Sequence, residues 1–328
     1  MTSGNLLADR RLDFARDLAA RGDVDAAVDL ARQALELAPD WVGAWFLLGE
    51  WCDRAGRRDE AVAAYGRCLA LDPADRAGAV VRLALLGAVA APPVLPPAYV
   101  AGVFDDCAEA FDRTLVERLE YAVPGELHDL VAAVAGAGAA YARVLDLGCG
   151  TGLAGERFRL AAAWLEGVDL SEGMLAVARR KSLYDTLVAG DLLAFLGATA
   201  ARYDLILAAD VLIYLGDLAA AARAVAAALV PGGRFAFSVE SMAGDGFCLT
   251  AGHRFAYGEG YLRRVLEAAG LAVEAIRPTT CRLEGGRPVA GLLAVSRRPA
   301  APADGLVPTP PAAGDDAEMP SAPNPPLH

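Results

Sequence analysis

An apolar run that ends in a cluster of glycines constrains the fold of this chain more than any other feature. Residues 144–152 read Val-Leu-Asp-Leu-Gly-Cys-Gly-Thr-Gly, which predicts a buried strand followed by a tight turn that opens a helix. Glycines in such a turn let the backbone approach a ligand that any Cβ would exclude. Gly150, Gly152 and Gly155 also fit the G-x-G-x-x-G spacing of dinucleotide-binding folds, so the turn predicts a ligand site.

The segment around this turn alternates between short apolar runs and amphipathic, Ala- and Leu-rich stretches such as 171–181, 217–229 and 258–269. This alternation predicts an α/β fold of the Rossmann-like, doubly wound type, with a mostly parallel sheet between two layers of helices. Because no helix separates the last two runs, the last strand is expected to pair antiparallel. The seven expected strands are 144–147, 165–169, 186–188, 205–208, 234–239, 273–276 and 292–296.

Three acidic residues follow one another at nearly equal spacing along this segment: Asp146, Asp169 and Asp191. In a doubly wound sheet they fall near the carboxyl ends of successive strands, where ligands bind. A carboxylate after the second strand can accept hydrogen bonds from a ribose diol, and one after the third can accept from the exocyclic amine of adenine. Asp146 ahead of the glycines and Asp191 after the third strand both argue against NAD. The negative charge around the turn favours a cationic ligand.

The first 91 residues contain an internal repeat with a period of 34 residues. The shift superposes seven pairs of residues, among them Gly22 on Gly56 and Pro39 on Pro73. This period, with small residues where helices would cross and a proline closing each unit, resembles the tetratricopeptide repeat. The second copy carries that family's signature residues Trp45, Leu48, Gly49, Ala61, Tyr65 and Pro73. A further helix is expected within 76–90, and the unit is expected to pack against the next domain because two repeats bury little apolar surface alone.

The ordered motifs of the α/β segment resemble those of the class I S-adenosylmethionine-dependent methyltransferases. Besides the glycine turn, they are Gly-Val-Asp-Leu-Ser-Glu-Gly-Met at 167–174, Gly-Asp-Leu at 190–192, Tyr-Asp-Leu-Ile-Leu-Ala-Ala-Asp-Val at 203–211 and Leu-Val-Pro-Gly-Gly-Arg at 229–234. The resemblance covers most of 99–298 and implies S-adenosyl-L-methionine as the cofactor. Together with the N-terminal repeats, the chain resembles a bacterial group of predicted methyltransferases that contain tetratricopeptide repeats.

The resemblance also implies which residues bind the cofactor. The glycine turn would face the methionine part. Asp169 would hold the ribose, and Leu170 would lie against adenine. Asp191 and the backbone of Leu192 would read the adenine edge, and Asp210 would lie near the sulfonium and the substrate. The full set of expected cofactor-binding residues is Asp146, Gly148, Cys149, Gly150, Asp169, Leu170, Asp191, Leu192 and Asp210.

A lid and a general base would complete such a site. Residues 99–122 contain Phe104 and Phe111 in a pattern that resembles the lid helix of many of these enzymes, with phenylalanine where the family has tyrosine. The two rings are seven residues apart and would share a helix face. His253 and Tyr214 are the two candidates for a catalytic base, and each is supported only by its expected place after a strand.

Composition excludes several other functions. The net charge is −12 and no basic stripe occurs, which argues against a nucleic-acid partner. The stretch 210–213 also lacks the Pro-Pro-Tyr element of nucleic-acid amino-methylating enzymes. Six cysteines without a C-x-x-C pair and only three histidines predict neither a metal site nor a disulfide framework. Four prolines interrupt the uncharged run 83–104, so no membrane helix is expected, and the protein is predicted to be cytoplasmic.

These signals divide the chain into tetratricopeptide-like helical repeats at 1–91, a Pro-rich linker at 92–98, a methyltransferase domain at 99–298 and a disordered, acidic Pro/Ala-rich tail at 299–328. The predicted function is S-adenosylmethionine-dependent methyl transfer to a small-molecule or carrier-bound acceptor. Two alternatives remain open: a protein methyltransferase that uses the repeats as a docking surface, and a scaffold that binds the cofactor or its product without catalysis. The acceptor atom and the oligomeric state stay open as well.

Overall fold

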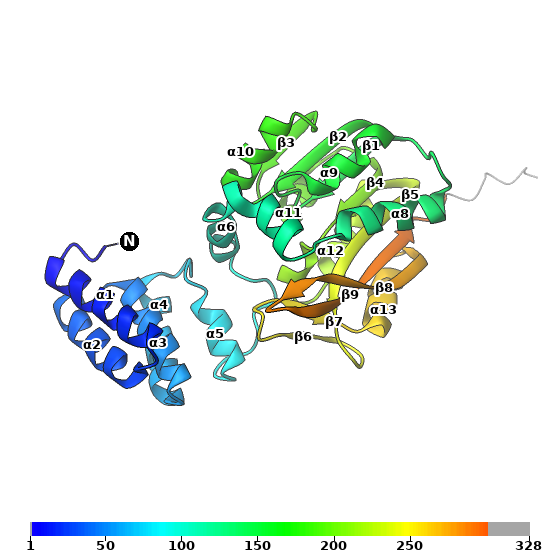
Figure 1. The fold of residues 1–328 in the computed structure, drawn as a ribbon. Coiled ribbons are helices and arrows are strands. Elements are labelled where there is room, and N and C mark those ends of the chain that lie inside the picture. The colour runs from blue at the N-terminus through cyan, green and yellow to red at the C-terminus, as the bar shows by residue number, and fades with distance from the viewer. Residues whose placement is uncertain (1, 301–328) are drawn as a thin grey trace, which may run out of the picture.

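A computed structural model describes residues 2–300, except for the side chains of Val116 and Glu117. The predicted disordered tail at 299–328 therefore lies outside the described residues, apart from its first two positions. A helical unit, blue to cyan in Figure 1, lies to one side of a larger α/β unit, green to orange. The Pro-rich segment connects the two.

The helical unit consists of two antiparallel helix pairs and one additional helix. Side chains cap two of the helices, since the Asn5 amide oxygen accepts from the backbone of Leu7 and Ala8 and the Asp23 carboxylate accepts from Ala26. Gly49 is required for close packing, because a Cβ there would lie 2.7 Å from the Tyr65 ring. The helices are α1 (Leu6–Ala20), α2 (Val24–Leu37), α3 (Val42–Arg54), α4 (Arg58–Leu71) and α5 (Ala79–Leu85), and α2 and α4 begin one predicted repeat apart.

The α/β unit is built on one mixed sheet in which β3, β2, β1, β4 and β5 run parallel in that order. β9 pairs antiparallel with β5, and β8 pairs antiparallel with β9, which confirms the predicted hairpin. All seven predicted runs lie in strands. These are β1 (Tyr141–Leu147), β2 (Ala162–Asp169), β3 (Thr186–Ala189), β4 (Tyr203–Ala208), β5 (Leu229–Ser241), β8 (Ala272–Glu284) and β9 (Arg287–Arg297).

The sheet that the structure describes has nine strands, two more than the seven predicted. β6 (Phe247–Leu249) and β7 (Phe255–Tyr257) form a hairpin that the sequence pattern did not indicate. Each spans only three residues, which is too short for an alternation of polar and apolar positions to stand out. β7 pairs parallel with the end of β5, where Glu240 faces Ala256. The hairpin thus extends the sheet beyond the carboxyl end of β4.

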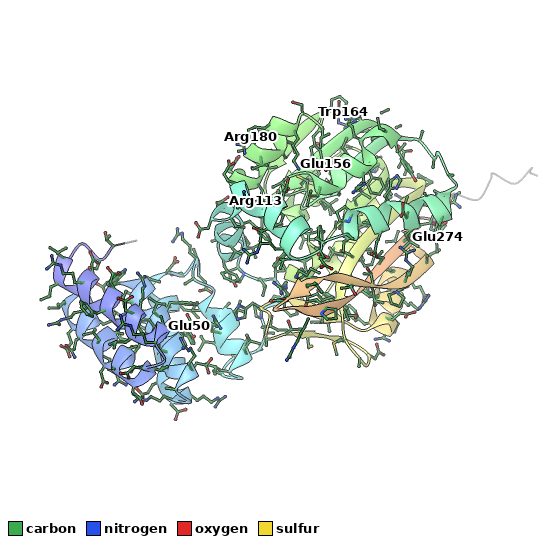
Figure 2. The ribbon with its side chains drawn as sticks, in the orientation of Figure 1. Glu50, Arg113, Glu156, Trp164, Arg180 and Glu274 are labelled. Atoms are coloured by element: carbon green, nitrogen blue, oxygen red, sulfur yellow. The ribbon has the colours of Figure 1, made fainter. Side chains whose placement is uncertain are left out.

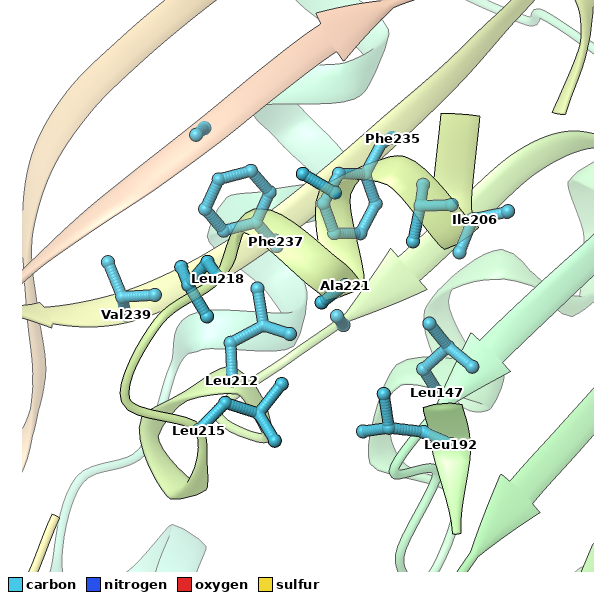
Figure 3. Close-up of a cluster of buried hydrophobic side chains, with 14 of the residues drawn as sticks. Leu147, Leu192, Ile206, Leu212, Leu215, Leu218, Ala221, Phe235, Phe237 and Val239 are labelled. Atoms are coloured by element: carbon cyan, nitrogen blue, oxygen red, sulfur yellow. The ribbon is translucent and has the colours of Figure 1, made fainter. Parts of the chain in front are cut away.

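Neighbouring residues of each strand point to opposite faces of the sheet, and each face has its own core. On one face, Ile206, Phe235 and Phe237 pack with residues of the helices on that side, as Figure 3 shows. On the other face, Leu205 and Leu207 pack with a second set of helices. The helices of the first face are α11 (Leu192–Ala198), α12 (Ala219–Ala228) and α13 (Glu259–Ala268). Those of the second face are α8 (Val123–Ala135) and α9 (Leu153–Phe158), while α10 (Glu172–Lys181) connects β2 and β3.

The lid region is not the single helix that was expected at 99–122. Helix α6 (Pro97–Asp105) ends early, and the chain continues through a 3-10 turn at Ala108–Ala110, one turn of α7 (Phe111–Arg113) and a π turn at Thr114–Arg118. The physical reason lies in tertiary hydrogen bonds at the break. The Asp105 carboxylate accepts from the Ser171 hydroxyl at 2.5 Å and from the Gly173 amide at 3.0 Å. Residues 97–118 are called the lid segment below.

The Pro-rich segment is part of the α/β unit rather than a free spacer. Val94 forms an antiparallel bridge with Leu215, and the Leu95 amide donates to the Tyr214 carbonyl oxygen at 2.9 Å. Leu95 and Val81, which belongs to α5, are buried in the same core cluster as the residues of β4 and β5. A cut at residue 91 would therefore remove part of the α/β core.

We expect Leu95→Ala to destabilise the α/β unit by about 2–5 kcal/mol, the usual cost of truncating a buried leucine. Leu95 is 1% exposed, so its truncation removes buried apolar surface and leaves a cavity in the core. Urea unfolding followed by circular dichroism measures the change. The matched control is Leu160→Ala, because Leu160 is 100% exposed and its removal is expected to change the free energy of unfolding by less than about 0.5 kcal/mol. Equal effects of the two variants would contradict the burial of the segment.

Candidate functional site

A cavity of about 380 Å³ opens at the carboxyl ends of β1, β2 and β4, beneath the lid segment. Ligand sites of doubly wound sheets occur at this edge. Most of the predicted site residues line it: Asp146, Gly148, Cys149, Gly150, Asp169, Leu170, Leu192, Asp210 and Tyr214. The two predicted residues that do not line it are Asp191 and His253.

The turn after β1 brings the backbone into the cavity. Gly148 and Gly150 have φ values of +63° and +53°, a region that favours glycine. A Cβ on Gly148 would lie 2.4 Å from Cγ2 of Val211, whereas a Cβ on Gly150 would meet nothing within 4 Å. Gly148 is therefore needed for space as well as for conformation, and Gly150 for conformation alone.

Asp169 holds this turn against the end of β2. Its Oδ2 accepts from the Gly150 amide at 2.8 Å, and its Oδ1 accepts from the Ser171 amide at 2.8 Å. Burial raises the pKa of Asp169 above its ordinary value, although the backbone hydrogen bonds oppose that shift. A carboxylate offers about four acceptor positions, so two remain for hydroxyl groups of a ligand.

Asp146 carries an unsatisfied acceptor at the cavity wall. The side chain is buried, and its Oδ2 accepts from the Tyr184 hydroxyl at 2.7 Å. Its Oδ1 has no hydrogen-bond partner among the described residues. Burial raises the pKa of Asp146 to about 7, and the nearby Asp169 adds to the rise. A buried acceptor without a partner is costly, so a cationic or N–H-bearing ligand at this wall would be stabilised.

Two predicted residues play other parts in the structure. Asp191 caps helix α11, where its Oδ1 accepts from the Ala194 amide at 2.9 Å, while Gly190 and Leu192 on either side of it line the cavity. His253 lies in the turn between β6 and β7 with a φ of +59°, outside the cavity lining. Burial lowers the pKa of His253, and two neighbouring arginines lower it further. His253 is thus not placed to act as a base on a ligand in the cavity.

Aromatic side chains form the lid side of the cavity. The Phe104 and Phe111 rings meet edge to face with their centroids 5.9 Å apart, and Phe104 and Tyr214 meet in the same way at 5.8 Å. The expectation that the two phenylalanines share one helix face is wrong, because α6 ends at Asp105 and Phe111 begins α7, but their rings still meet. Burial raises the pKa of Tyr214, which makes its hydroxyl a poor base near neutral pH.

Asp210 stands where β4 ends, with a φ of +53°. Its Oδ1 accepts from the Ser238 hydroxyl at 2.5 Å, and its Oδ2 lies 3.8 Å from Nη1 of Arg282. Burial raises the pKa of Asp210. Arg282 and Arg254 also line the cavity. Sequence reasoning missed both arginines, because they lie far along the chain from the glycine turn and belong to no motif.

Charged contacts attach the lid segment to the turn below it. The Asp112 carboxylate accepts from the Thr151 hydroxyl and lies 2.6 Å from Nζ of Lys181, the only lysine of the chain. Lys181 also contacts Glu156 at 2.7 Å. Figure 2 shows Glu156 and Arg180 on the part of the α/β unit that carries Arg113 of the lid segment.

Among the side chains that the structure describes, no three of His, Cys, Asp or Glu gather in a way that could hold a metal ion. No helix within the described residues combines the length and the apolar composition that a membrane span requires.

We expect Gly148→Ala to destabilise the protein by several kcal/mol, because it adds a steric clash with Val211 to the cost of a left-handed backbone. Gly150→Ala carries only the conformational cost, about 1–2 kcal/mol. Urea unfolding of the two single variants and of Gly148→Ala/Val211→Ala measures the difference. Truncating Val211 should recover part of the loss, which a double-mutant cycle would detect as coupling. A loss in Gly148→Ala no greater than in Gly150→Ala would contradict the close approach.

The raised pKa of Asp146 predicts how the ligand-free protein responds to pH. An unfolded aspartate titrates near 3.9, below the folded value of about 7, so the protonated carboxyl stabilises the folded state. This contribution is fully present below about pH 4 and is lost as the pH rises to about 7. Asp146→Asn keeps an acceptor for Tyr184 and removes the charge, so its free energy of unfolding should fall less between pH 5 and pH 8 than that of the wild type. Parallel pH profiles of the two proteins would refute the assignment.

Comparison with known proteins gives two family matches. Residues 144–233 match the methyltransferase domain family, and residues 42–75 match the tetratricopeptide repeat family. Over 59 residues, or 18% of its length, the chain is 44% identical to a malonyl-[acyl-carrier protein] O-methyltransferase of Erwinia pyrifoliae. The match spans only 22% of that relative.

Two solved structures resemble the chain over about half its length. The N-methyltransferase NodS of Bradyrhizobium japonicum in complex with S-adenosylhomocysteine is 24% identical, with 58% of this chain and 98% of that chain covered and a TM-score of 0.45. The magnesium protoporphyrin IX methyltransferase of Synechocystis with bound S-adenosylmethionine is 20% identical, with 53% and 79% covered and a TM-score of 0.41. By these family matches, residues 144–233 of this chain are similar to a methyltransferase domain, and residues 42–75 are similar to a tetratricopeptide repeat.

Proposed function

We propose that this protein transfers a methyl group from S-adenosylmethionine to a small-molecule or carrier-bound acceptor. The observation that carries the proposal is the meeting of three features in one cavity. These are the glycine turn after β1, the Asp169 carboxylate at the end of β2 and the unpartnered Oδ1 of Asp146. Together they offer backbone space, an acceptor for hydroxyl groups and an acceptor for a cation or an amine.

Each part of the cavity suits one part of the cofactor. Asp169 would accept the ribose hydroxyls, and the apolar side chains of Leu170 and Leu192 would lie beside the adenine. Asp146 and the turn at Gly148 would face the cationic methionine part, where the unpartnered Oδ1 gains a hydrogen bond. S-adenosylmethionine, when bound, supplies an activated methyl group on a sulfonium. Asp191 caps helix α11, and its neighbours Gly190 and Leu192 would face the cofactor.

The chain's own contribution to the reaction is to position the acceptor and to exclude water. Phe104, Phe111 and Tyr214 present apolar and aromatic surface on the lid side of the cavity, which favours a nearby cation and keeps solvent away. The contacts of Asp112 with Thr151 and Lys181 hold that cover in place. Holding the reacting groups in line accounts for much of the rate of such a transfer.

The acceptor class rests on two observations. The stretch that is similar to a malonyl-[acyl-carrier protein] O-methyltransferase supports a carrier-bound acid as one member of the class. Protein methylation would instead use the helical unit, where α2, α3 and α4 line a groove of about 620 Å³. Within the described residues that groove shares no lining side chain with the cavity above β1, so we place the small-molecule or carrier-bound acceptor first.

Calorimetric titration of the purified, cofactor-free protein tests the proposal. We expect binding of S-adenosylmethionine with micromolar affinity and no binding of NAD, because the carboxylates around the glycine turn repel a pyrophosphate. Asp169→Asn should weaken S-adenosylmethionine binding roughly tenfold or more, since it removes a charged acceptor for the ribose. Asp245→Asn is the control, because that exposed carboxylate pairs with Arg264 on the surface.

The titration also yields results that would reject the proposal. Folded protein that binds NAD but not S-adenosylmethionine would reject the cofactor. Wild-type affinity in Asp169→Asn would reject the placement of the ribose. Retained far-ultraviolet circular dichroism in both variants ensures that lost binding does not reflect unfolding.

A further inference from the structure

Two arginines form the part of the cavity wall farthest along the sheet from Asp169. Arg254 precedes β7 and Arg282 lies in β8, and among the described lining residues they are the only basic ones. Arg282 is 7% exposed. A guanidinium stays charged at any physiological pH, and its burial is costly unless it has partners. Two guanidinium groups at a cavity wall therefore need partners of opposite charge, from the protein or from a ligand.

The β6–β7 hairpin places Arg254 above the end of β4. β9 occupies one edge of β5 up to Glu240, so β7, which also pairs with Glu240, must occupy the edge that β4 uses earlier along β5. The pairing of β4 with β5 ends at Ala208, and Asp210 follows two residues later. Arg254 thus comes from an element that covers the point where a methyl acceptor would meet the cofactor.

Three carboxylates of the described chain lie within 4 Å of the two guanidinium groups, and of these only Glu240 is hydrogen-bonded to both. Glu240, which is buried, is shared, since it accepts from Nε of Arg254 at 2.7 Å and also from Arg282. Nη2 of Arg254 contacts Glu284 at 2.5 Å, but the Glu284 side chain is 52% exposed and its charge is screened by solvent. Asp210 lies 3.8 Å from Arg282, beyond hydrogen-bond distance. Among the atoms that the structure describes, Nε and Nη2 of Arg254 have hydrogen-bond partners and Nη1 has none, which leaves a charged donor at the wall.

The wall at the two arginines contains one carboxylate that could accept a proton, Asp210, and its Oδ1 is already hydrogen-bonded to the Ser238 hydroxyl. The described lining residues include no histidine or lysine, and His253 lies outside the cavity. Burial raises the pKa of Tyr121 and Tyr214, which therefore stay protonated. An acceptor that is already anionic needs no base, and a carboxylate matches the planar donor fork of arginine.

We propose, on the basis of the methyl transfer proposed above, that the acceptor is a carboxylate bound by Arg254 and Arg282 and that the product is a methyl ester. The acceptor oxygen forms the bond to the methyl carbon as the sulfur–carbon bond breaks, and the electron pair of that bond stays on sulfur. The sulfonium becomes a neutral thioether, and no proton is released. The reaction therefore needs positioning by the two arginines and no general base.

Alkali treatment of the methylated product tests this inference. Full-length protein is incubated with S-adenosylmethionine carrying a tritium-labelled methyl group and with an extract of bacterial cells that retains small molecules and acyl carrier proteins. We expect most of the transferred label to be released as volatile methanol, because alkali hydrolyses methyl esters and leaves methyl groups on nitrogen, carbon and sulfur in place. Label that resists alkali would overturn the carboxylate inference and leave methyl transfer standing. Protein that binds S-adenosylmethionine but transfers no label would overturn both.

Variants of Arg254 test the part assigned to the arginines. Arg254→Gln should raise the apparent KM for the acid identified from the labelled ester by roughly tenfold or more, while the affinity for S-adenosylmethionine stays at the wild-type value. Arg254→Lys keeps the positive charge but loses the planar set of N–H donors. Its apparent KM should lie between those of the wild type and Arg254→Gln. Arg264→Gln is the matched control, because it removes a similar ion pair, the one between Arg264 and Asp245 on the surface of α13. Arg282 is left intact, since its removal would leave Glu240 buried without a full partner.

Two results would overturn the assignment to Arg254. One is an apparent KM in Arg254→Gln that equals the value in Arg264→Gln. The other is a loss of S-adenosylmethionine affinity in Arg254→Gln as large as its change in KM, which would indicate a general disturbance of the cavity. Calorimetry and initial-rate measurements on the same preparations separate these cases.

Discussion

The hydrogen bond from the Gly150 amide to the Asp169 carboxylate is the contact on which the rest of the site depends. It joins the turn after β1 to the end of β2, two strands that are neighbours in the sheet. The same turn packs against Val211, just after β4, so closely that a Cβ on Gly148 would not fit. The ends of three parallel strands therefore fix one short loop. Asp146, Leu170 and the lid segment take their places around that loop.

The sequence was sufficient to predict the parts of the molecule that local patterns encode. The seven strands, the glycine turn and Asp169 all follow from apolar runs and from residue types at fixed spacing. The sequence could not show whether Asp191 binds a ligand, because a carboxylate just before a helix gives the same pattern whether it caps the helix or binds adenine. Arg254 and Arg282 gave no signal, because only the pairing of β7 and β8 within the sheet brings them to the cavity. The lid helix was misjudged because Asp105 bonds to residues in the distant α10 region.

The cavity is electrically divided along the edge of the sheet. Towards β1 and β2 it presents Asp146 and Asp169, whose carboxyl groups burial makes harder to ionise. Towards β7 and β8 it presents two guanidinium groups that share one buried carboxylate. A cation beside Asp146 would give its Oδ1 a partner, and an anion beside the two arginines would be attracted to that cation across the space between. The order of the strands alone sets this direction.

The Pro-rich segment gives the two units of the chain a direct mechanical connection. Leu95 is hydrogen-bonded to the backbone of Tyr214, and the ring of that tyrosine lies at the cavity. Val81, on the last helix of the repeat unit, shares a core with Leu95. A protein that bound the repeats and shifted this helix would change the free energy of filling the cavity. By thermodynamic linkage, filling the cavity would change the affinity of the repeats for that protein by the same factor. The repeat unit and the cavity would then act as a reciprocal pair of sensors, each reporting the occupancy of the other.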